Sequence, residues 1–447
     1  MVLYLQLFPM KYLCLIIFLF FIQLNLYDCK LRFVFTIYRH GARSPMSHGT
    51  DVLGEKWDTY SQLTKVGIRQ QYLLGVKNRK KYNDFLSLQY EPKEVCVFST
   101  NWNRTILSAT ANLQGLFSSV PSQMTSEAIK NALPPGDNSV LEKEIFDLGT
   151  SSLPFGMQII PVGIIPEKDR LKTFYDTCPT SKKILAKNID NEEIQDMVSS
   201  FNEKYGKILV QLLKIEDEYF FLNFRNIVQL CDVFVSDYTD GREISLLRDA
   251  GIDFNEFNET AFKFFIADNF DYFAGNTEIN KAYSSSLLKT ILKNIQSRVD
   301  LDSNNELVYN SSNPKMIIYS LHDYDITSLI VTIQDMFSLE QIRFYPSYSS
   351  SLTFELHNDD NIFTVKAYFN DNTFFEIGYE QFNQIISSKA YSQKQYNILC
   401  QIDDGSINYF AFFTFVFGII AVLEFFFIYR KLRRSKTKRY VGTQNLI

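Results

Sequence analysis

Three short apolar segments, each followed by a polar loop, constrain the fold of this chain more than any other feature. Residues Leu31–Tyr38, Val95–Ser99 and Lys315–Ser320 are rich in β-branched and aromatic residues, a composition that predicts buried β-strands. The first two are followed by segments with helical spacing, Leu63–Tyr82 and Thr105–Phe117. This alternation of strand, loop and helix predicts an α/β fold with a mainly parallel sheet flanked by helices.

The middle of the chain has a different pattern. From about residue 121 to 275, loops rich in Pro and Gly give way to long amphipathic stretches, Asn191–Phe220 and Ile244–Phe270. We expect this region to be an inserted, mostly helical cap packed over the sheet edge. Strand patterns return at Ser351–Leu356 and Phe363–Phe369.

Both ends of the chain carry apolar runs. The first, Tyr12–Leu26, follows Lys11 and is too short for a span, so we predict a signal peptide over residues 1–28, with an uncleaved anchor as the alternative. The second, Ile407–Tyr429, holds 23 residues with one charge, Glu424, and as a helix would extend roughly 34 Å. We therefore predict a transmembrane helix over residues 407–429.

The charges after this run orient the chain. Residues 430–447 carry seven cations and no acid, which predicts a cytosolic tail and a luminal or extracellular domain over residues 29–404. The chain is thus expected to be a type I membrane protein in contact with the lipid bilayer. Because the whole chain has a net charge of −5, the part before the tail carries −12, which argues against a nucleic-acid partner.

The cysteines outside the leader are Cys29, Cys96, Cys178, Cys231 and Cys400. None forms a CxxC pair, so a zinc site is not indicated. In a secretory compartment such widely separated cysteines are expected to form disulfides, and an odd number leaves at least one free thiol.

The loop after the first predicted strand carries the strongest chemical motif, Arg39-His40-Gly41-Ala42-Arg43-Ser44-Pro45. Ligands of open α/β sheets bind at the carboxyl ends of strands. Two arginines beside a histidine fit an anion, because their planar forks match phosphate oxygens, and Gly41 allows close backbone approach. A neutral His40 could attack phosphorus and form a covalent intermediate.

Two further strand ends present matching groups. Arg104 begins a predicted helix after the second strand, where the helix dipole also favours anions, and His322-Asp323 follows Lys315–Ser320. An imidazole can donate to a phosphate oxygen, and a carboxylic acid can protonate the leaving alcohol. Lone Arg or His residues after strands are usually salt-bridge partners or helix caps, so the interpretation depends on the ordered set.

This ordered set resembles the histidine acid phosphatase family. The resemblance is carried by YRHGARSP at Tyr38–Pro45, LTKVGIRQQYLLG at Leu63–Gly75, STNWNRTILSATANLQGLF at Ser99–Phe117 and YSLHDYD at Tyr319–Asp325. It covers roughly residues 31–400, with the middle aligning poorly. The resemblance implies a phosphoglycerate-mutase-like sheet domain with a helical cap. With leader, span and tail, the arrangement is most similar to that of the lysosomal member of the family.

The resemblance also implies roles for individual residues. His40 is expected to be the nucleophile and Asp323 the proton donor, so activity should peak at acid pH, because an ordinary Asp titrates near pH 4. The phosphate ligands are expected to be Arg39, Arg43, Arg104 and His322. No metal or other cofactor is implied, and the substrates are phosphate monoesters.

Cysteine pairing is implied in the same way. Cys178, in its TCP context, and Cys400 match two family positions that are joined by a disulfide. Cys231 matches a cap cysteine whose partner position here holds Ser350, so we expect Cys231 to be free or paired with Cys29 or Cys96.

Three sequons begin at Asn103, Asn258 and Asn310. A glycan at Asn103 would block the arginine loop, so we expect modification at Asn258 and Asn310 only. The tail sequence Tyr440-Val441-Gly442-Thr443 departs from the tyrosine sorting motif of the lysosomal relative. The expected location is therefore the lysosome, another endomembrane compartment or the cell surface, and a homodimer remains open.

Three other functions compete with an acid phosphatase. A mutase is disfavoured by the leader and the span. A phytase is disfavoured by the acidic to neutral cap and by His322-Asp323-Tyr324, where inositol-polyphosphate phosphatases carry His-Ala-Glu. A catalytically inactive receptor ectodomain is disfavoured because every expected catalytic residue type is retained.

Overall fold

The computed structural model describes residues 30–46, 53–54, 56–117, 123–165, 178–217, 219–304, 309–401, 419 and 422–431. The chain divides into two units, Met1–Cys400 and Gln401–Ile447. The predicted signal peptide lies outside the described residues, as do His48, Cys29 and nearly all of the tail.

The described residues of the first unit form a seven-stranded sheet with the order β3-β2-β4-β1-β5-β6-β7. Its strands are β1 (Lys30–Arg39), β2 (Val95–Ser99), β3 (Gly163–Ile164), β4 (Met316–Leu321), β5 (Ser351–Asp359), β6 (Ile362–Phe369) and β7 (Asn372–Gly378). β1, β2, β3 and β4 pair in parallel, whereas β5, β6 and β7 pair antiparallel. The prediction of a central sheet flanked by helices is confirmed. The prediction that this sheet is mainly parallel is only half right, because three of its six described strand pairings are antiparallel.

The antiparallel half follows from the short connections between its strands. Parallel neighbours need a crossover of a dozen or more residues, whereas antiparallel neighbours need only a tight turn. Asp360 and Asn361 join β5 to β6, and Asn370 and Asp371 join β6 to β7. All four have positive φ values, the conformation of the two-residue hairpin turns that match strand twist.

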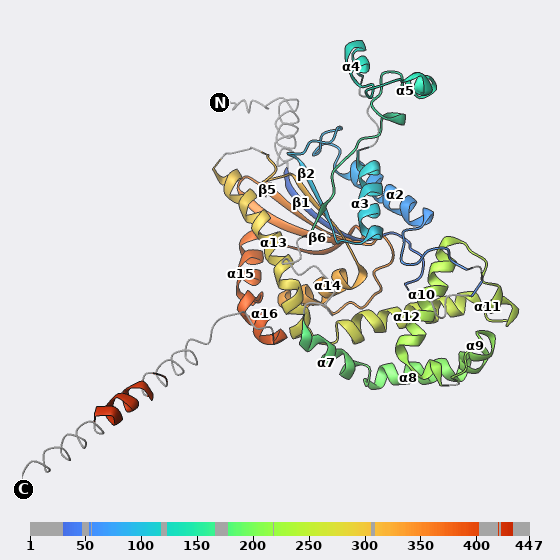
Figure 1. The fold of residues 1–447 in the computed structure, drawn as a ribbon, viewed down its shortest axis with the longest axis vertical. Coiled ribbons are helices and arrows are strands. Elements are labelled where there is room, and N and C mark those ends of the chain that lie inside the picture. Colours follow the sequence, from blue (N-terminus) through green and yellow to red (C-terminus); the bar gives the residue numbers. More distant parts are fainter. Residues whose placement is uncertain are drawn as a thin grey trace, which may run out of the picture. The chain divides into compact units, whose positions relative to one another are not determined.

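Residues of β1 alternate between two cores. Phe33, Phe35 and Ile37 pack with α13, α14 and α15 on one face, while Val34 and Tyr38 pack against α3 on the other. The helices of these layers are α2 (Lys65–Lys81), α3 (Asn103–Leu116), α13 (Thr277–Ser303), α14 (Asp323–Phe337), α15 (Tyr379–Lys389) and α16 (Gln393–Cys400). Because side chains alternate along a strand, one apolar strand serves both faces of this central sheet (Figure 1).

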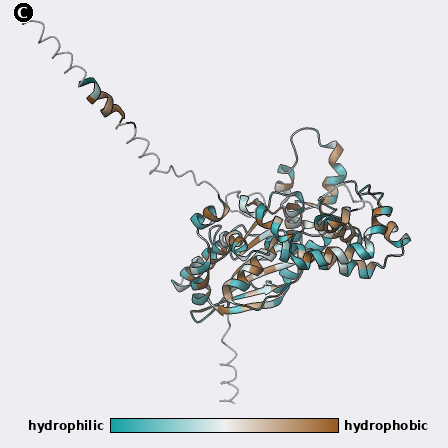
Figure 2. Ribbon diagram, turned by 90° about the horizontal axis from the view of Figure 1, so that it is seen from below, coloured by the Kyte–Doolittle hydropathy of each residue, from teal (hydrophilic) through white to brown (hydrophobic). Residues whose placement is uncertain are grey.

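A group of helices lies between β3 and β4 in the sequence and beside the sheet in space (Figure 1). It comprises α7 (Pro179–Asn188), α8 (Glu192–Phe201), α9 (Lys207–Leu212), α10 (Phe224–Asp240), α11 (Ser245–Asp249) and α12 (Phe254–Ile266). We call residues 178–276 the helical region. It has its own core, rich in phenylalanine. Figure 2 shows that helices of the protein carry both hydrophobic and hydrophilic residues, as one-sided burial requires.

The first part of the expected cap behaves differently. Helices α4 (Ser126–Asn131) and α5 (Glu142–Leu148) bury no residue, and they lie away from the helical region, beyond α3 (Figure 1). The amphipathic pattern correctly predicted the longer helices of the cap. It did not show that α4 and α5, which fall within the predicted cap in sequence, lie apart from those helices.

The predicted membrane span lies mostly outside the described residues. Of residues 407–429, the structure describes 419 and 422–429; residues 422–431 are helical with exposed apolar side chains. Within the described parts of the chain, no helix combines the length and the apolar character needed to cross a membrane.

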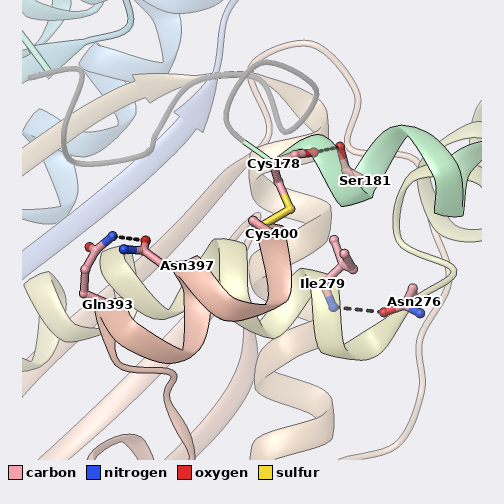
Figure 3. The surroundings of a disulfide bond; sticks show 7 residues. All are labelled: Cys178, Ser181, Asn276, Ile279, Gln393, Asn397 and Cys400. Carbon is pink, nitrogen blue, oxygen red and sulfur yellow. Dashed lines mark hydrogen bonds between the residues drawn. A yellow bond between two sulfur atoms is a disulfide. The ribbon is translucent and has the colours of Figure 1, made fainter. Parts of the chain in front are cut away.

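One disulfide joins the helical region to the end of the sheet region. Cys178, the residue before α7, is bonded to Cys400 at the end of α16, 222 residues away (Figure 3). This is the pairing that the resemblance implied. Among the described residues, Cys96 and Cys231 are free, in agreement with the expectation that Cys231 lacks its family partner.

Candidate active site

The carboxyl ends of β1, β4 and β2 meet because these strands are parallel neighbours. Arg39 lies opposite Leu321, and Ser99 lies opposite Ser320. The residue directly after β1, His40, donates its backbone N–H to Leu321 O at 3.0 Å. Two predicted site residues, His40 and His322, are thus brought together, with ring centroids 5.5 Å apart.

The hydrogen bond of the His40 ring identifies its tautomer. Nδ1 lies 2.8 Å from the carbonyl oxygen of Gly41, and a carbonyl oxygen only accepts hydrogen bonds. Nδ1 therefore carries the proton, which leaves the lone pair on Nε2. This is the nitrogen that a nucleophilic histidine must present.

The pKa of His40 is held well below its ordinary value of 6.5. Burial is the largest cause, followed by the positive charges of Arg104 and Arg39, then His322 and Arg43. Both burial and nearby cations disfavour a charged imidazolium. His40 therefore stays neutral into the acid range.

We call Arg39, Arg43 and Arg104 the arginine cluster. All three are buried, and each has a buried Nε without a hydrogen-bond partner. Other buried arginines share that feature. What distinguishes the arginine cluster is that all three of its arginines lie near His40. Like charges in close proximity are unfavourable unless an anion compensates them, which makes this cluster a candidate phosphate site.

Arg39 is held from several sides. Its NH1 donates to Pro346 O at 2.8 Å, and its NH2 pairs with Asp323 Oδ2 at 2.8 Å. The guanidinium also lies over the rings of Tyr345 and Tyr348, 4.8 and 4.4 Å from their centroids. An arginine that stacks on two rings and donates to two different partners has little freedom to move.

Arg104 is the second residue of α3. Its NH1 donates to Ser61 Oγ at 2.8 Å, and its NH2 lies 3.5 Å from His322 Nδ1. Burial, followed by the charge of Arg43, lowers the pKa of Arg104 to about 10. This lowering reflects the electrostatic cost of the cluster.

His322 follows β4 and is the N-cap residue of α14. Its Nε2 lies 3.0 Å from Thr100 Oγ1, a residue from the loop after β2 that sequence reasoning did not identify. Burial first, then the three cluster arginines, hold the pKa of His322 well below its ordinary value.

Asp323 is the first residue of α14, and its side chain is partly exposed. Its Oδ1 accepts from Tyr324 N at 3.0 Å. The next carboxyl of the motif, Asp325, accepts from His322 N at 3.0 Å and from the hydroxyl of Tyr283. Burial raises the pKa of Asp325 to about 7.

Gly41 has a different role from the one expected. A Cβ atom at this position would lie 2.3 Å from the backbone oxygen of Gly67 in α2. The close approach that requires glycine is therefore between two protein backbones. Gly41 lets α2 pack directly against the loop that carries His40.

A pocket of about 390 Å³ opens beside Arg43 and Asp323, within the size range of small-molecule sites. The helical region supplies most of its wall, through Arg225, Val228, Gln229, Asp232, Phe265, Asp268, Asn269 and Phe273. No sequence motif marked these residues. Asp268 pairs with Arg225, and burial, opposed by Arg225, raises the pKa of Asp268 to about 6.

The three sequons occupy different environments. Asn103 is exposed at the first position of α3, whereas Asn258 in α12 and Asn310 before β4 are half-buried. Glycosylation of Asn258 and Asn310 stays a prediction. Within the described ranges, no group of three or more His, Cys, Asp or Glu residues could hold a metal ion.

Comparison with known proteins connects this geometry to a family. Residues 30–370 match the model of the histidine phosphatase superfamily (branch 2). Lysosomal acid phosphatase of Xenopus laevis is 28% identical over 355 residues, which cover 77% of this chain and 70% of that protein. Prostatic acid phosphatase of Bos taurus is 25% identical over 367 residues, 78% of this chain and 79% of its own length.

The solved structures agree at the level of the fold. Phytase from Citrobacter braakii has a TM-score of 0.55 at 14% identity, covering 82% of this chain and 99% of the phytase. Because the family match extends over the strands and loops that carry the arginine cluster, the resemblance seen in the sequence is confirmed. The chain is a phosphatase and belongs to branch 2 of the histidine phosphatase superfamily.

Proposed function

We propose that this protein is an acid phosphatase that hydrolyses phosphate monoesters through a phosphohistidine on His40. The observation that carries the proposal is a neutral His40, with its lone pair on Nε2, surrounded by three buried arginines. In the first step, Nε2 attacks phosphorus and the bond to the leaving oxygen breaks. Arg39, Arg43, Arg104 and His322 stabilise the charge of the equatorial oxygens.

Asp323 serves as the proton donor. It gives its proton to the leaving alkoxide in the first step, so that a neutral alcohol departs. In the second step its carboxylate takes a proton from water, whose oxygen attacks phosphorus. The bond from phosphorus to Nε2 breaks, inorganic phosphate forms and His40 regains its lone pair. Throughout, Nδ1–H remains bonded to Gly41 O.

The phytase alternative gains only the fold likeness from the solved structures. The wall of the pocket beside Asp323 contains Arg43 and Arg225, which pair with Asp232 and Asp268. Because these carboxyl groups already occupy both arginines, the arginines are less available to bind further phosphates of a leaving group.

Trapping the intermediate tests this mechanism. Full-length protein mixed with phosphate-labelled p-nitrophenyl phosphate and quenched within one turnover should carry an acid-labile, base-stable label on His40. Turnover of p-nitrophenyl phosphate from pH 4 to 8 should exceed that of phytate at each pH. A label on another residue, or faster release of phosphate from phytate, would contradict the proposal.

The location is also a proposal. Relatives named lysosomal acid phosphatase and a disulfide between Cys178 and Cys400 support a luminal domain over residues 29–404, followed by a span at residues 407–429 and a cytosolic tail. A tag after Ile447 should be cleaved by protease added to sealed vesicles while the domain is protected. Protection of both parts would exclude this topology.

A further inference from the structure

Asp232 projects from α10 into the pocket and contacts the arginine cluster. Its Oδ1 accepts from Arg43 NH2 at 2.7 Å, and its Oδ2 accepts from Arg43 NH1 at 3.1 Å. Oδ2 also accepts from the backbone N–H of Met46 at 2.9 Å. The carboxylate thus accepts hydrogen bonds both from the end of the Arg43 guanidinium and from the backbone of the loop that carries Arg43.

The five N–H groups of Arg43 can be assigned one by one. NH1 donates to Asp232 Oδ2 and to Ser44 O, the latter at 3.1 Å. NH2 donates one hydrogen to Asp232 Oδ1, and within the described part of the chain the buried Nε has no partner. What remains is Nε–H and the second hydrogen of NH2, which point from the same edge of the planar group.

This remaining edge is a bidentate donor of the kind that binds two phosphate oxygens. We propose that Asp232 is a positioning residue: by holding the end of the Arg43 guanidinium, it turns the Nε–NH2 edge toward the phosphoryl group on His40. The proposal rests on the proposed function, since it names the group that the edge would bind. Asp232 would act through Arg43 and is therefore a positioning residue and not a catalytic one.

The anchors of the other two arginines make Asp232 distinctive. Arg39 is anchored by Pro346 O and by the proposed acid Asp323, and Arg104 by Ser61 Oγ. Among the described contacts, Arg43 alone of the three is anchored by a residue of the helical region.

Asp232 also affects the charge of the site. A fixed anion beside the arginine cluster weakens the attraction of the cluster for phosphate, both before and after reaction.

Asp232 should have two opposite effects on the binding of phosphate. Its grip on Arg43 orients the guanidinium and favours binding, whereas its negative charge opposes binding, and these effects can be tested separately. In Asp232→Asn the charge is lost, and the amide nitrogen faces a guanidinium donor, so the bidentate grip is lost too. We expect kcat/KM for p-nitrophenyl phosphate to fall roughly 10- to 100-fold, mainly through kcat, because misplacement of a ligand acts on the transition state. Orthovanadate mimics the five-coordinate phosphorus of the transition state, so its inhibition should weaken by a factor similar to the fall in kcat/KM.

Inhibition by inorganic phosphate should change less than about 3-fold, because loss of the anion offsets loss of orientation. Asp232→Glu should recover part of the vanadate affinity, since it restores a carboxylate. Equal changes for vanadate and phosphate, or unchanged vanadate inhibition, would overturn the positioning role.

A double-mutant cycle with Arg43 separates positioning from a structural effect. Lysine cannot make the bidentate pair, so in an Arg43→Lys background Asp232→Asn should reduce kcat/KM less than 2-fold further. An undiminished loss in that background would show that Asp232 acts by another route. Asp240→Asn, at the end of the same helix, is the matched control and should leave activity unchanged.

The result is distinguishable from failure of the proposed function. If the wild-type protein does not turn over p-nitrophenyl phosphate, the proposed function is wrong. If the wild type is active and Asp232→Asn behaves like Asp240→Asn, only the positioning role is wrong. Asp232→Asn is also the substitution least disruptive to folding, because its amide oxygen still accepts from Met46 N.

Discussion

The sheet region and the helical region contribute to the site in different ways. Every residue with a proposed catalytic or phosphate-binding role lies at the end of β1 or in the loop after it, between β4 and α14, or at the start of α3 or α14. The helical region instead supplies the outer wall of the pocket and the anchor Asp232. In the proposed mechanism, parallel strand ends therefore place the reacting groups, while the helical region would contribute substrate selection and the positioning of Arg43.

Their cores differ as well. The helical region buries a cluster of aromatic rings in contact, among them Phe201, Phe221, Phe257 and Phe264, whereas α13 and α14 cover the sheet with Leu and Ile side chains. The disulfide between Cys178 and Cys400 joins the two regions. The chemistry and the stability of the molecule should therefore respond to different substitutions.

The largest expected effect is on the chemistry. His40→Ala removes the proposed nucleophile, so kcat for p-nitrophenyl phosphate should fall by about 10⁴-fold or more, with the melting temperature little changed. His357, which lies on β5 and bonds Glu355 at 2.9 Å, provides a matched histidine. His357→Ala measured under the same conditions should retain activity, and comparable losses in both variants would contradict a special role for the β1 strand end.

The next effect separates leaving groups. Asp323→Asn cannot donate a proton, so hydrolysis of alkyl phosphates should slow by roughly 10²- to 10⁴-fold. Aryl phosphates such as p-nitrophenyl phosphate should lose far less, because a good leaving group departs without protonation. Steady-state rates for a matched alkyl and aryl pair measure the difference, and equal losses would remove Asp323 from the proton-donor role.

The sequence predicted the sheet region better than the helical region, for a physical reason. The strand Val95–Ser99 was predicted with its observed bounds, and the helix predicted from Leu63 begins after its N-cap Thr64. Buried parallel strands leave continuous apolar runs, and the loops after them carry an ordered set of charged residues that resembles the motifs of the family. Both patterns are local in sequence.

The contributions of the helical region are not local. Asp232 and Arg43 are separated by 189 residues, and Asp232 occupies one turn of an amphipathic helix like many exposed acids. Thr100 and Tyr348, which contact His322 and Arg39, likewise depend on packing across the sheet edge. Burial and charge pairing of this kind follow from tertiary structure, so sequence patterns alone did not reveal them.

Loss of the disulfide tests how the two regions are joined. In Cys400→Ser the link across 222 residues is absent, and the chain-entropy model gives a loss of about 5 kcal/mol before strain is considered. The melting temperature should fall by several degrees while KM for p-nitrophenyl phosphate is unchanged below the transition. A large change in KM at low temperature would show that the site depends on the link.

The smallest expected effect concerns pH and the motif residue Asp325. Burial raises its pKa from 3.8 to about 7, with the hydrogen bonds from Tyr283 and His322 N opposing the rise. A carboxyl whose pKa is raised on folding contributes stability below its unfolded pKa, and that stability is lost as pH rises through the folded value. For this shift the loss between pH 5 and 8 is roughly 2 to 3 kcal/mol. Asp268, with a pKa of about 6, acts in the same direction.

Glu355 provides the contrast within the same fold. Its pKa is lowered to about 2: burial, the largest single influence, opposes the shift, and the combined hydrogen bonds and charge interactions with His357, Lys81 and Tyr82 outweigh it. Its stabilising contribution is therefore present above its unfolded pKa and is lost only as pH falls toward 2. Denaturant unfolding of Asp325→Asn from pH 5 to 8 should show a shallower fall in the free energy of unfolding than the wild type, while Glu355→Gln keeps the wild-type slope over that range. If Asp325→Asn retained the full slope, Asp325 would not be its source, and Asp268→Asn would then test whether the slope arises in the helical region.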